Sequence, residues 1–224
     1  MSVAMSETVV KEIEQRFVVS TTCWQQYEAI LQAFPDQAGV RITYLDGRLT
    51  LVSHTRRHDW FEKVLGRFVE AIAEGLGIEC EVAGHATYRR EDVDAGVEGD
   101  QVYYFGADAE IMRGPIPVDL KTQPPPDLAI EIEATHPADD SIAVRERLGV
   151  REVWRVNVIK ETVEFAQIGT AGTYEKTSRS RAFPTLESVD LSQQLTLAEK
   201  LGWSAWVRQL NEWVRTVLLP RGGV

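Results

Sequence analysis

The sequence predicts an α/β (α+β) protein, in which strands and helices share one core, on three observations. Acidic and aliphatic side chains alternate over residues 127–133, which is typical of a strand with one apolar face. Residues 58–75 carry apolar side chains at helical spacing. Residues 40–53 contain two apolar segments joined by Asp46-Gly47, a strong signal for a two-residue hairpin turn. Because no repeat or low-complexity linker interrupts the chain, we expect one α/β domain with a further helix packed on it.

Composition and charge limit the class of protein. The chain has 224 residues, of which 44% are hydrophobic, enough for a sizeable core. Its two cysteines cannot form a disulfide framework, and the Cys and His residues lack zinc-site spacing. The sequence shows no signal peptide and no apolar run near 18 residues, so we expect a soluble, cytoplasmic protein without membrane contact. The net charge of −10 argues against indiscriminate nucleic-acid binding, because phosphate contacts need basic surface, but a local basic cleft is compatible with it.

The first half of the chain begins with polar residues 1–16, which are expected to form a loose leader. Thr22-x-x-Gln25 has the form of a capping box and predicts a helix to about Phe34. The other elements expected here are a short strand over 17–19, the hairpin, the helix over 58–75, strands near 78–83 and 86–89, an acidic loop over 91–99 and a strand over 101–105. Residues 106–123 show no clear periodicity.

The second half continues with the acidic strand and then a short helix. Asp140 is the predicted N-cap of that helix, and Leu148-Gly149 is a glycine-type stop. The strands expected next are 152–157 and 162–167, as an antiparallel pair, and 173–177. Thr196-x-x-Glu199 is a second capping box, which predicts that the last helix begins there. The expected organisation is a leader (1–16), a domain (17–195) and a C-terminal amphipathic helix (196–224).

The C-terminal helix carries an apolar stripe rich in tryptophan. Its members are Trp203, Trp206, Val207, Leu210, Trp213, Val214 and Val217. We interpret the stripe as core packing against the domain. The alternative is a homodimer face, since aromatic residues are enriched at interfaces.

The acidic strand is the one pattern that suggests chemistry. Glu131 and Glu133 lie on the same face, about 7 Å apart at a rise of about 3.3 Å per residue. Carboxylates from such a pair can converge on one divalent cation, and hard oxygen ligands suit Mg²⁺ or Mn²⁺. A solvated acidic edge of an amphipathic strand is the alternative. Glutamate is a poor strand former, and two in register repel each other unless a cation or a base lies between them, which favours the cation.

Several stretches, in this order, resemble one known family. They are YLDGRL, the His58-Asp59 pair, YRREDVDAGVEGDQVYYF, PPPDLAIEIE, LGVREVWRV and RAFP. The set is similar to the Uma-two family of the PD-(D/E)XK nuclease superfamily, with cyanobacterial members most similar in pattern, over roughly Thr21 to Glu212. The resemblance implies a restriction-endonuclease-like mixed sheet flanked by helices, and cation-dependent hydrolysis of phosphodiesters.

The same resemblance implies a set of site residues. Asp100 matches the motif aspartate, Glu131 the last acidic position, and His58 the family histidine at the helix entry. Glu133 lies where close members carry Asp. The implied cation, Mg²⁺ or Mn²⁺, would be held by Asp100, Glu131 and Glu133. Asp127 matches the aspartate of the family's Pro-Asp pair at the start of the acidic strand.

Three positions depart from the family pattern. Gly99 replaces the usual Pro, and Asp59 replaces a common Glu. Ser141 stands where members carry Lys or Arg on the short helix. Arg145, one helical turn later on the same face, is the candidate substitute, able to stabilise charge but not to act as a base.

The remaining charged residues have simpler interpretations. His54, His85 and His136 are interpreted as structural or solvated. The basic groups Arg56-Arg57, Arg89-Arg90 and Lys176, Arg179 and Arg181 are interpreted as surface charge, with a phosphate-binding cleft as the alternative. Three functions stay open: a metal-dependent nuclease acting on nucleic acid, with DNA favoured over RNA; a non-catalytic relative that binds nucleic acid or protein; and an acidic protein that binds metal without nuclease activity. Ser141 separates the first two.

Overall fold

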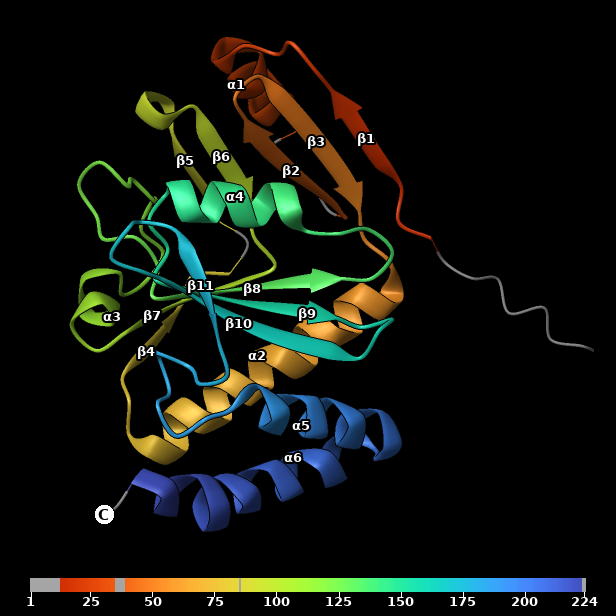
Figure 1. Ribbon diagram of the computed structural model, residues 1–224, viewed down its shortest axis with the longest axis vertical. Helices are drawn as coiled ribbons and strands as arrows, with labels where there is room; N and C mark the ends of the chain where they lie inside the picture. Colours follow the sequence, from red (N-terminus) through yellow and green to blue (C-terminus); the bar gives the residue numbers. More distant parts are fainter. Residues whose placement is uncertain (1–12, 35–38, 85, 223–224) are drawn as a thin grey trace, which may run out of the picture.

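A six-stranded mixed sheet forms the centre of the protein (Figure 1). The structure, a computed structural model, describes residues 13–34, 39–84 and 86–222. The strand order is β11-β10-β9-β8-β7-β4, with β8 and β9 parallel and all other neighbours antiparallel. The strands are β4 (Cys80–Val82), β7 (Gln101–Phe105), β8 (Leu128–Glu133), β9 (Glu152–Asn157), β10 (Thr162–Ile168) and β11 (Tyr174–Thr177). The predicted class and the mixed sheet flanked by helices are confirmed.

A second sheet, which the sequence did not predict as a separate layer, is antiparallel throughout. Its order is β1-β3-β2-β6-β5. The strands are β1 (Arg16–Val19), β2 (Val40–Leu45), β3 (Arg48–Ser53), β5 (Thr87–Arg90) and β6 (Ala95–Glu98), and helix α1 (Trp24–Ala33) packs on this sheet. The predicted hairpin is confirmed, and Asp46 and Gly47 both have positive φ, as its turn requires.

Strand β6 corrects the prediction of an acidic loop over 91–99. A one-turn 3-10 helix (Glu91–Val93) precedes the strand. Ala95 and Val97 are buried between β2 and β5. The strand is four residues long and lies among acidic residues, so its apolar positions were too few to show a period.

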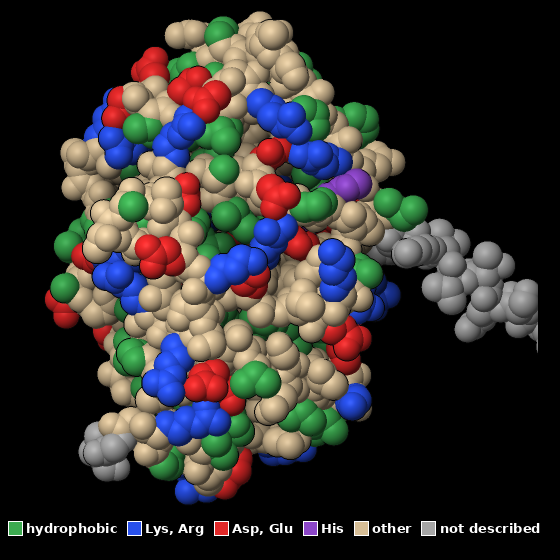
Figure 2. Space-filling view, viewed as in Figure 1, with side chains coloured by type: hydrophobic (Ala, Val, Ile, Leu, Met, Phe, Trp, Pro, Cys, Tyr) green, Lys and Arg blue, Asp and Glu red, His purple; other side chains and the backbone are tan. Residues whose placement is uncertain are grey.

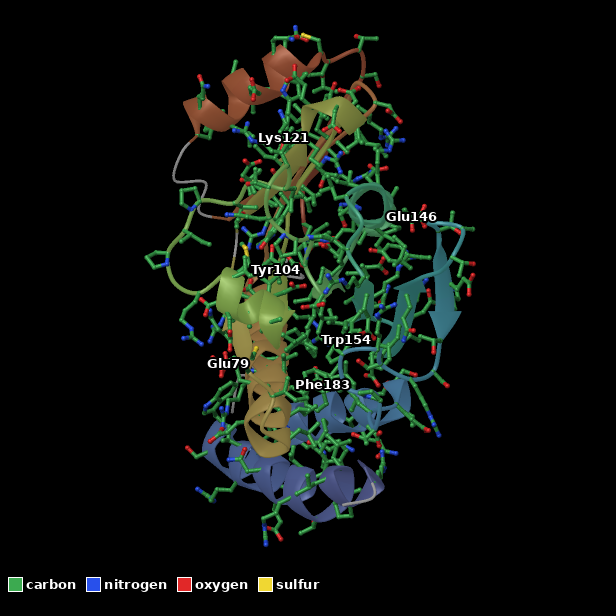
Figure 3. All side chains as sticks on the ribbon, turned by 90° about the vertical axis from the view of Figure 1, so that its left-hand side faces the viewer. Glu79, Tyr104, Lys121, Glu146, Trp154 and Phe183 are labelled. Carbon is green, nitrogen blue, oxygen red and sulfur yellow. The ribbon has the colours of Figure 1, made fainter. Side chains whose placement is uncertain are left out.

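Helices cover the two faces of the mixed sheet unequally. Helices α2 (Arg56–Leu76), α5 (Ser188–Lys200) and α6 (Trp203–Trp213) pack on one side, and α4 (Asp139–Arg147) lies between the mixed sheet and the second sheet (Figure 1). The remaining helical elements are α3 (Ala107–Ile111), the π-helical turn Val214–Leu218 and the 3-10 turn Leu219–Gly222. Trp154 and Phe183, labelled in Figure 3, are fully buried in the core that α2, α5 and α6 cover. Their ring centroids lie 6.2 Å apart.

Three predicted helix starts are wrong. Helix α1 has Cys23 as its N-cap, and the Cys23 N–H donates to Gln26 Oε1 over 2.8 Å. Helix α4 has Ala138 as its N-cap, while Asp140 lies inside it and pairs with Arg16. These capping patterns are short and polar, so they recur by chance within one turn of the true boundary.

The second capping box is wrong for a different reason. Thr196 lies within α5, and its hydroxyl donates to the Ser192 carbonyl oxygen over 3.0 Å. Helix α5 begins after Glu187, and the next helix begins after Gly202. The predicted single C-terminal helix is therefore two helices, α5 and α6.

The predicted N-terminal leader is only partly described, because residues 1–12 lie outside the described residues. Glu14 is buried, and its carboxylate accepts the Thr135 N–H over 2.9 Å. The Gln15 N–H donates to Ser53 Oγ over 2.8 Å. These hydrogen bonds attach the end of the predicted leader to strand β3 and to the segment that follows β8.

The tryptophan stripe packs mainly into the core, as predicted. Trp206, Leu210 and Val214 are buried, and Trp213 stacks on Phe68 with ring centroids 6.2 Å apart. Trp203 and Val217 are the exceptions, since both are exposed. Among the described residues, no helix combines the length and apolar character needed to cross a membrane.

The stripe gives a direct test of the core. Trp206 is 0% exposed and Trp203 is 48% exposed on the same helix. Replacing Trp206 with Ala should lower the free energy of unfolding by about 3–5 kcal/mol, because it leaves a large cavity. Trp203→Ala should cost about 1 kcal/mol or less. Urea denaturation of both variants measures the difference, and equal losses would contradict the assignment of the core face.

Candidate active site

A cavity of about 60 Å³ lies between the two sheets, where the start of α2, the start of β7 and the end of β8 meet. The sequence explains this convergence: α2 begins directly after β3, and β7 and β8 are neighbours in the mixed sheet. The lining side chains discussed below are Arg41, His54, His58, Asp100, Glu131 and Ser141.

Asp100 lies at the back of this cavity and is almost fully buried. Its Oδ2 accepts the Ile132 N–H over 2.9 Å and lies 3.2 Å from His58 Nε2. Its Oδ1 lies 3.6 Å from Arg41 Nε and 3.9 Å from His54 Nε2. Burial acts to raise the pKa of Asp100, but the two histidines and the Ile132 N–H outweigh it and lower the pKa to about 2. Asp100 is therefore a stable carboxylate.

Glu131 is opposite Asp100, on the neighbouring strand, and its two oxygens are both occupied. Arg145 Nε donates to Oε1 over 2.6 Å, and Ser141 Oγ donates to Oε2 over 2.7 Å. Burial raises the pKa of Glu131, and Arg145 acts in the opposite direction. The alternative of a solvated acidic edge is wrong for this strand, because Glu131 and Glu133 are 5% and 4% exposed.

Arg145 is on the same face of α4 as Ser141, as predicted, but it is fully buried. It is not among the described residues that line the cavity. Its Nη1 and Nη2 have no hydrogen-bond partner within the described part of the chain. A Cβ atom at position 99 would overlap Arg145 Nη2, so Gly99 leaves the space that the guanidinium occupies. In this structure Arg145 acts on Glu131 rather than reaching into the cavity.

Glu133 does not face the same cavity as Asp100 and Glu131. Its carboxylate accepts the Ala138 N–H over 2.8 Å and an Asn157 amide N–H over 3.1 Å, and Arg155 donates to it as well. It lines a separate hollow with Arg155, Asn157 and Lys160. The structure therefore brings together two of the three predicted cation ligands.

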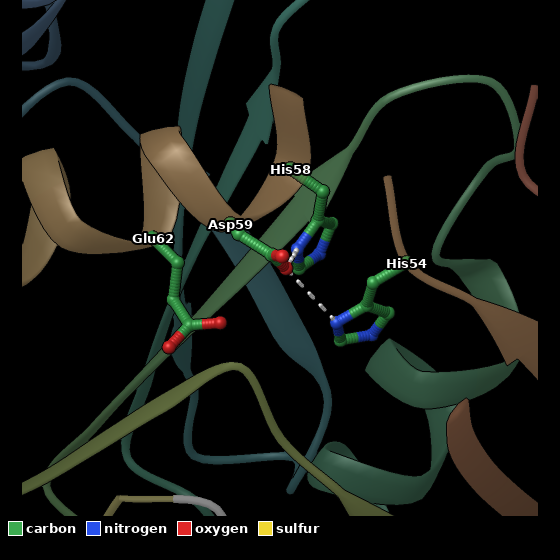
Figure 4. A group of neighbouring side chains, drawn as sticks. All are labelled: His54, His58, Asp59 and Glu62. Carbon is green, nitrogen blue, oxygen red and sulfur yellow. Dashed lines mark ion pairs between the residues drawn. The ribbon is translucent and has the colours of Figure 1, made fainter. Parts of the chain in front are cut away.

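His58 joins the site from the first turn of α2, where Thr55 is the N-cap. His54 precedes that helix, and the two imidazole rings lie 4.0 Å apart between their centroids (Figure 4). Burial acts to lower the pKa of His58, but the Asp100 carboxylate outweighs it and the pKa is raised. His54, interpreted above as structural or solvated, and Glu62 are the residues that the sequence interpretation missed. The spacing His54-x3-His58-Asp59-x2-Glu62 across a helix start is the signal that could have found them.

The other predicted residues lie in surface or supporting contacts. Asp127 pairs with Arg151 and accepts the Phe105 N–H over 2.8 Å, which holds the start of β8. Most of the basic groups are in surface ion pairs: Arg57 with Glu199, Arg89 with Glu28, Arg90 with Asp92, Lys176 with Glu164 and Arg179 with Glu187. On the visible face in Figure 2, basic and acidic side chains are interleaved. These pairs support the surface-charge interpretation. His85 lies outside the described residues.

The protein is therefore an α+β protein in which a mixed sheet, flanked by helices, brings Asp100 and Glu131 to one cavity. The Uma2 family, described as "Putative restriction endonuclease", matches residues 24–200. The chain belongs to this family, as the motifs predicted.

Comparison with solved structures gives a more distant similarity. The chain is similar to "a putative nuclease belonging to DUF820" from Anabaena variabilis, at 14% identity and a TM-score of 0.42. The similarity covers 77% of this chain and 90% of that chain. No curated protein matches the chain.

The contact between Gly99 and Arg145 gives a test of the site. Gly99→Ala should lower the free energy of unfolding by about 1–3 kcal/mol, because the new methyl group displaces a buried guanidinium. Gly222→Ala is the control, since an added Cβ there would make only an ordinary contact, 3.7 Å from Thr185 Cγ2. Chemical denaturation measures both.

The same substitution should be coupled to Arg145. In an Arg145→Ala background the added methyl group meets no guanidinium, so the cost of Gly99→Ala should fall, with a coupling of roughly 0.5–3 kcal/mol. An equal cost in both backgrounds would show that the two residues do not compete for space.

Proposed function

We propose that the protein is a divalent-cation-dependent nuclease whose site is formed by Asp100 and Glu131. The observation that carries this proposal is that two buried carboxylates line one cavity, one directly before β7 and one in the neighbouring strand β8. Mg²⁺ keeps several waters and is commonly bound by one or two carboxylates. The donor set therefore fits Mg²⁺ or Mn²⁺. Each hydrogen-bonded oxygen of Glu131 retains a second lone pair for a cation.

The surrounding residues would set the geometry of these two ligands. The Ile132 N–H and His58 hold the Asp100 carboxylate, and Arg145 and Ser141 hold Glu131. When bound, the cation would activate water and offset the charge that develops on a phosphodiester. Arg41 and Arg16 are the basic side chains that line the cavity, and an approaching phosphate would compete for them with their acidic partners. The substrate is nucleic acid, and the family description favours DNA over RNA.

A non-catalytic, nucleic-acid- or protein-binding relative is the second candidate function, and one observation favours it. Arg145 already offsets the charge of Glu131, while Ser141 supplies no cation in the place where family members carry Lys or Arg. A cation entering the cavity would meet a carboxylate that is already paired. This candidate keeps the fold and the cavity without hydrolysis.

Manganese binding and hydrolysis test the first candidate. We expect Mn²⁺ binding and slow cleavage of DNA by the wild type, and loss of both in Asp100→Asn and Glu131→Gln. Glu133→Gln is the matched control, because that carboxylate lines another hollow, and it should retain both. Calorimetry measures binding and gel electrophoresis measures cleavage. Equal Mn²⁺ binding by the wild type and by Glu131→Gln would contradict the assigned ligands.

The position of Ser141 gives a gain-of-function test. Its hydroxyl lies 2.7 Å from Glu131, beside the cavity, so Ser141→Lys restores a cation where the family carries one. One preorganised electrostatic donor contributes about 10²–10³-fold in rate, so cleavage should rise by roughly ten- to a thousand-fold. Arg145→Ala should abolish cleavage in the wild-type background, because Glu131 loses its partner.

The combined result separates the two candidates. If the wild type binds Mn²⁺ but cleaves neither single- nor double-stranded DNA or RNA, and Ser141→Lys gains nothing, the nuclease proposal is wrong and the binding function replaces it.

A further inference from the structure

A cluster of four side chains lies at the start of α2, beside the acidic pair. His54 precedes the helix, and His58, Asp59 and Glu62 follow on its first turns (Figure 4). One ligand atom from each lies within 4.8 Å of all the others. We propose that these residues form a second metal site, for a transition metal such as zinc, distinct from the site of Asp100 and Glu131.

The orientation of His58 is the first observation that points to a metal. Its Nε2 lies 3.2 Å from Asp100 Oδ2, so the ring proton that faces this carboxylate is on Nε2. When the ring is neutral, as metal binding requires, its lone pair is therefore on Nδ1. The side chain is 3% exposed, and Nδ1 has no hydrogen-bond partner among the residues described. A buried polar atom without a hydrogen-bond partner costs about 1–3 kcal/mol whether it donates or accepts, and a metal ion bound to the neutral ring would remove that cost.

The arrangement of the two rings is the second observation. Both imidazoles turn Nε2 towards Asp100, at 3.2 Å and 3.9 Å, and Nδ1 towards Asp59 Oδ1, at 3.9 Å and 3.7 Å. Metal-ligating histidines commonly donate the other ring N–H to a carboxylate, which fixes the tautomer and ring orientation. Asp100 is the carboxylate that both rings face through Nε2, on the side away from the proposed metal. The metal side is the Nδ1 side, where Asp59 lies.

The distances and ligand types define the metal class. Ligands at about 2.0–2.2 Å from one ion lie up to about 4 Å apart, so the four side chains need only small movements to close around it. Two imidazole nitrogens with carboxylate oxygens suit Zn²⁺ or Co²⁺ rather than Mg²⁺, which prefers oxygen alone. Glu62 is the most constrained ligand, since Gln101 Nε2 donates to it over 3.5 Å and Arg41 Nη2 lies 3.8 Å away.

Asp100 connects this cluster to the cavity. It contacts both histidines and lines the same cavity as Glu131. A metal on the Nδ1 side would fix both imidazoles and thereby the donors that orient Asp100. We infer a structural metal that orders the site from outside rather than a second reacting centre.

Cobalt is the probe for the test, because its visible absorption reports nitrogen ligation. Metal-free full-length protein titrated with Co²⁺ should develop the spectrum of a nitrogen- and oxygen-ligated ion, and Zn²⁺ should displace it. Asp59→Asn should weaken Co²⁺ binding by more than about 100-fold, since loss of outer partners alone costs 10–100-fold. Asp59 is mostly exposed, so this variant should fold. His54→Gln is a second ligand variant, and thermal denaturation confirms that both are folded.

Two further variants serve as controls. Glu74→Gln removes an exposed carboxylate from the same helix and should leave Co²⁺ binding unchanged. Glu131→Gln separates the two sites, because it removes a proposed ligand of the other cation and none of the nitrogen ligands whose absorption is measured. If Co²⁺ binding is lost in Glu131→Gln and retained in Asp59→Asn and His54→Gln, the ion belongs to the acidic pair. If folded wild-type protein binds no Co²⁺, the second site does not exist.

Discussion

The ion pair between Glu131 and Arg145 is the constraint on which the rest of the site depends. Both side chains are buried, and removing either charge from water costs several kcal/mol unless a partner is close. The 2.6 Å contact from Arg145 Nε supplies that partner and ties α4 to the centre of the mixed sheet. Because α4 also packs against β2 and β6, the same pair holds the two sheets around the cavity. Removing one member would leave an uncompensated buried charge.

The other buried carboxylates follow the same rule. Asp100 is stabilised as a carboxylate by the Ile132 N–H and His58, and Glu133 by Arg155 and the start of α4. Glutamate disfavours strands, yet Glu131 and Glu133 are tolerated in β8 because an arginine donates to each of them. The chemistry open to the protein is therefore set by how much of each carboxylate its partners leave available to a cation. For Glu131 that competition is with an arginine inside its own fold.

Much of the fold could be predicted from the sequence because the relevant patterns are long or specific. The 21-residue helix α2, the Asp46-Gly47 hairpin and strand β8 follow from apolar periodicity and turn chemistry. The separate antiparallel sheet could not be predicted, since strand pairing such as β2 with β6 depends on long-range contacts rather than local pattern. The predicted helix starts were wrong where a capping pattern of two polar residues occurred near or inside a helix, as at Thr196.

The candidate site, too, could be predicted from the sequence only in part. Asp100, Glu131 and His58 were predicted from motifs, and the structure brings them together. The separate hollow of Glu133 depends on Arg155 and Asn157 of the neighbouring strand, which pair with β8 in a register that the sequence does not state. His54 was missed because it lies outside the helix, and its approach to Asp100 exists only after the two sheets come together. The space that Gly99 leaves for Arg145 likewise depends on tertiary packing. The sequence alone showed only that Gly99 and Ser141 depart from the family pattern.

The measurement that tests the central claim most directly is a crystal structure of the full-length protein soaked in manganese, with anomalous scattering used to locate the ion. The account predicts one manganese ion coordinated by Asp100 and Glu131, with Arg145 still donating to Glu131 from the buried side. Manganese bound by Glu133 instead, or Glu131 paired with Arg145 and no manganese in the cavity, would contradict it.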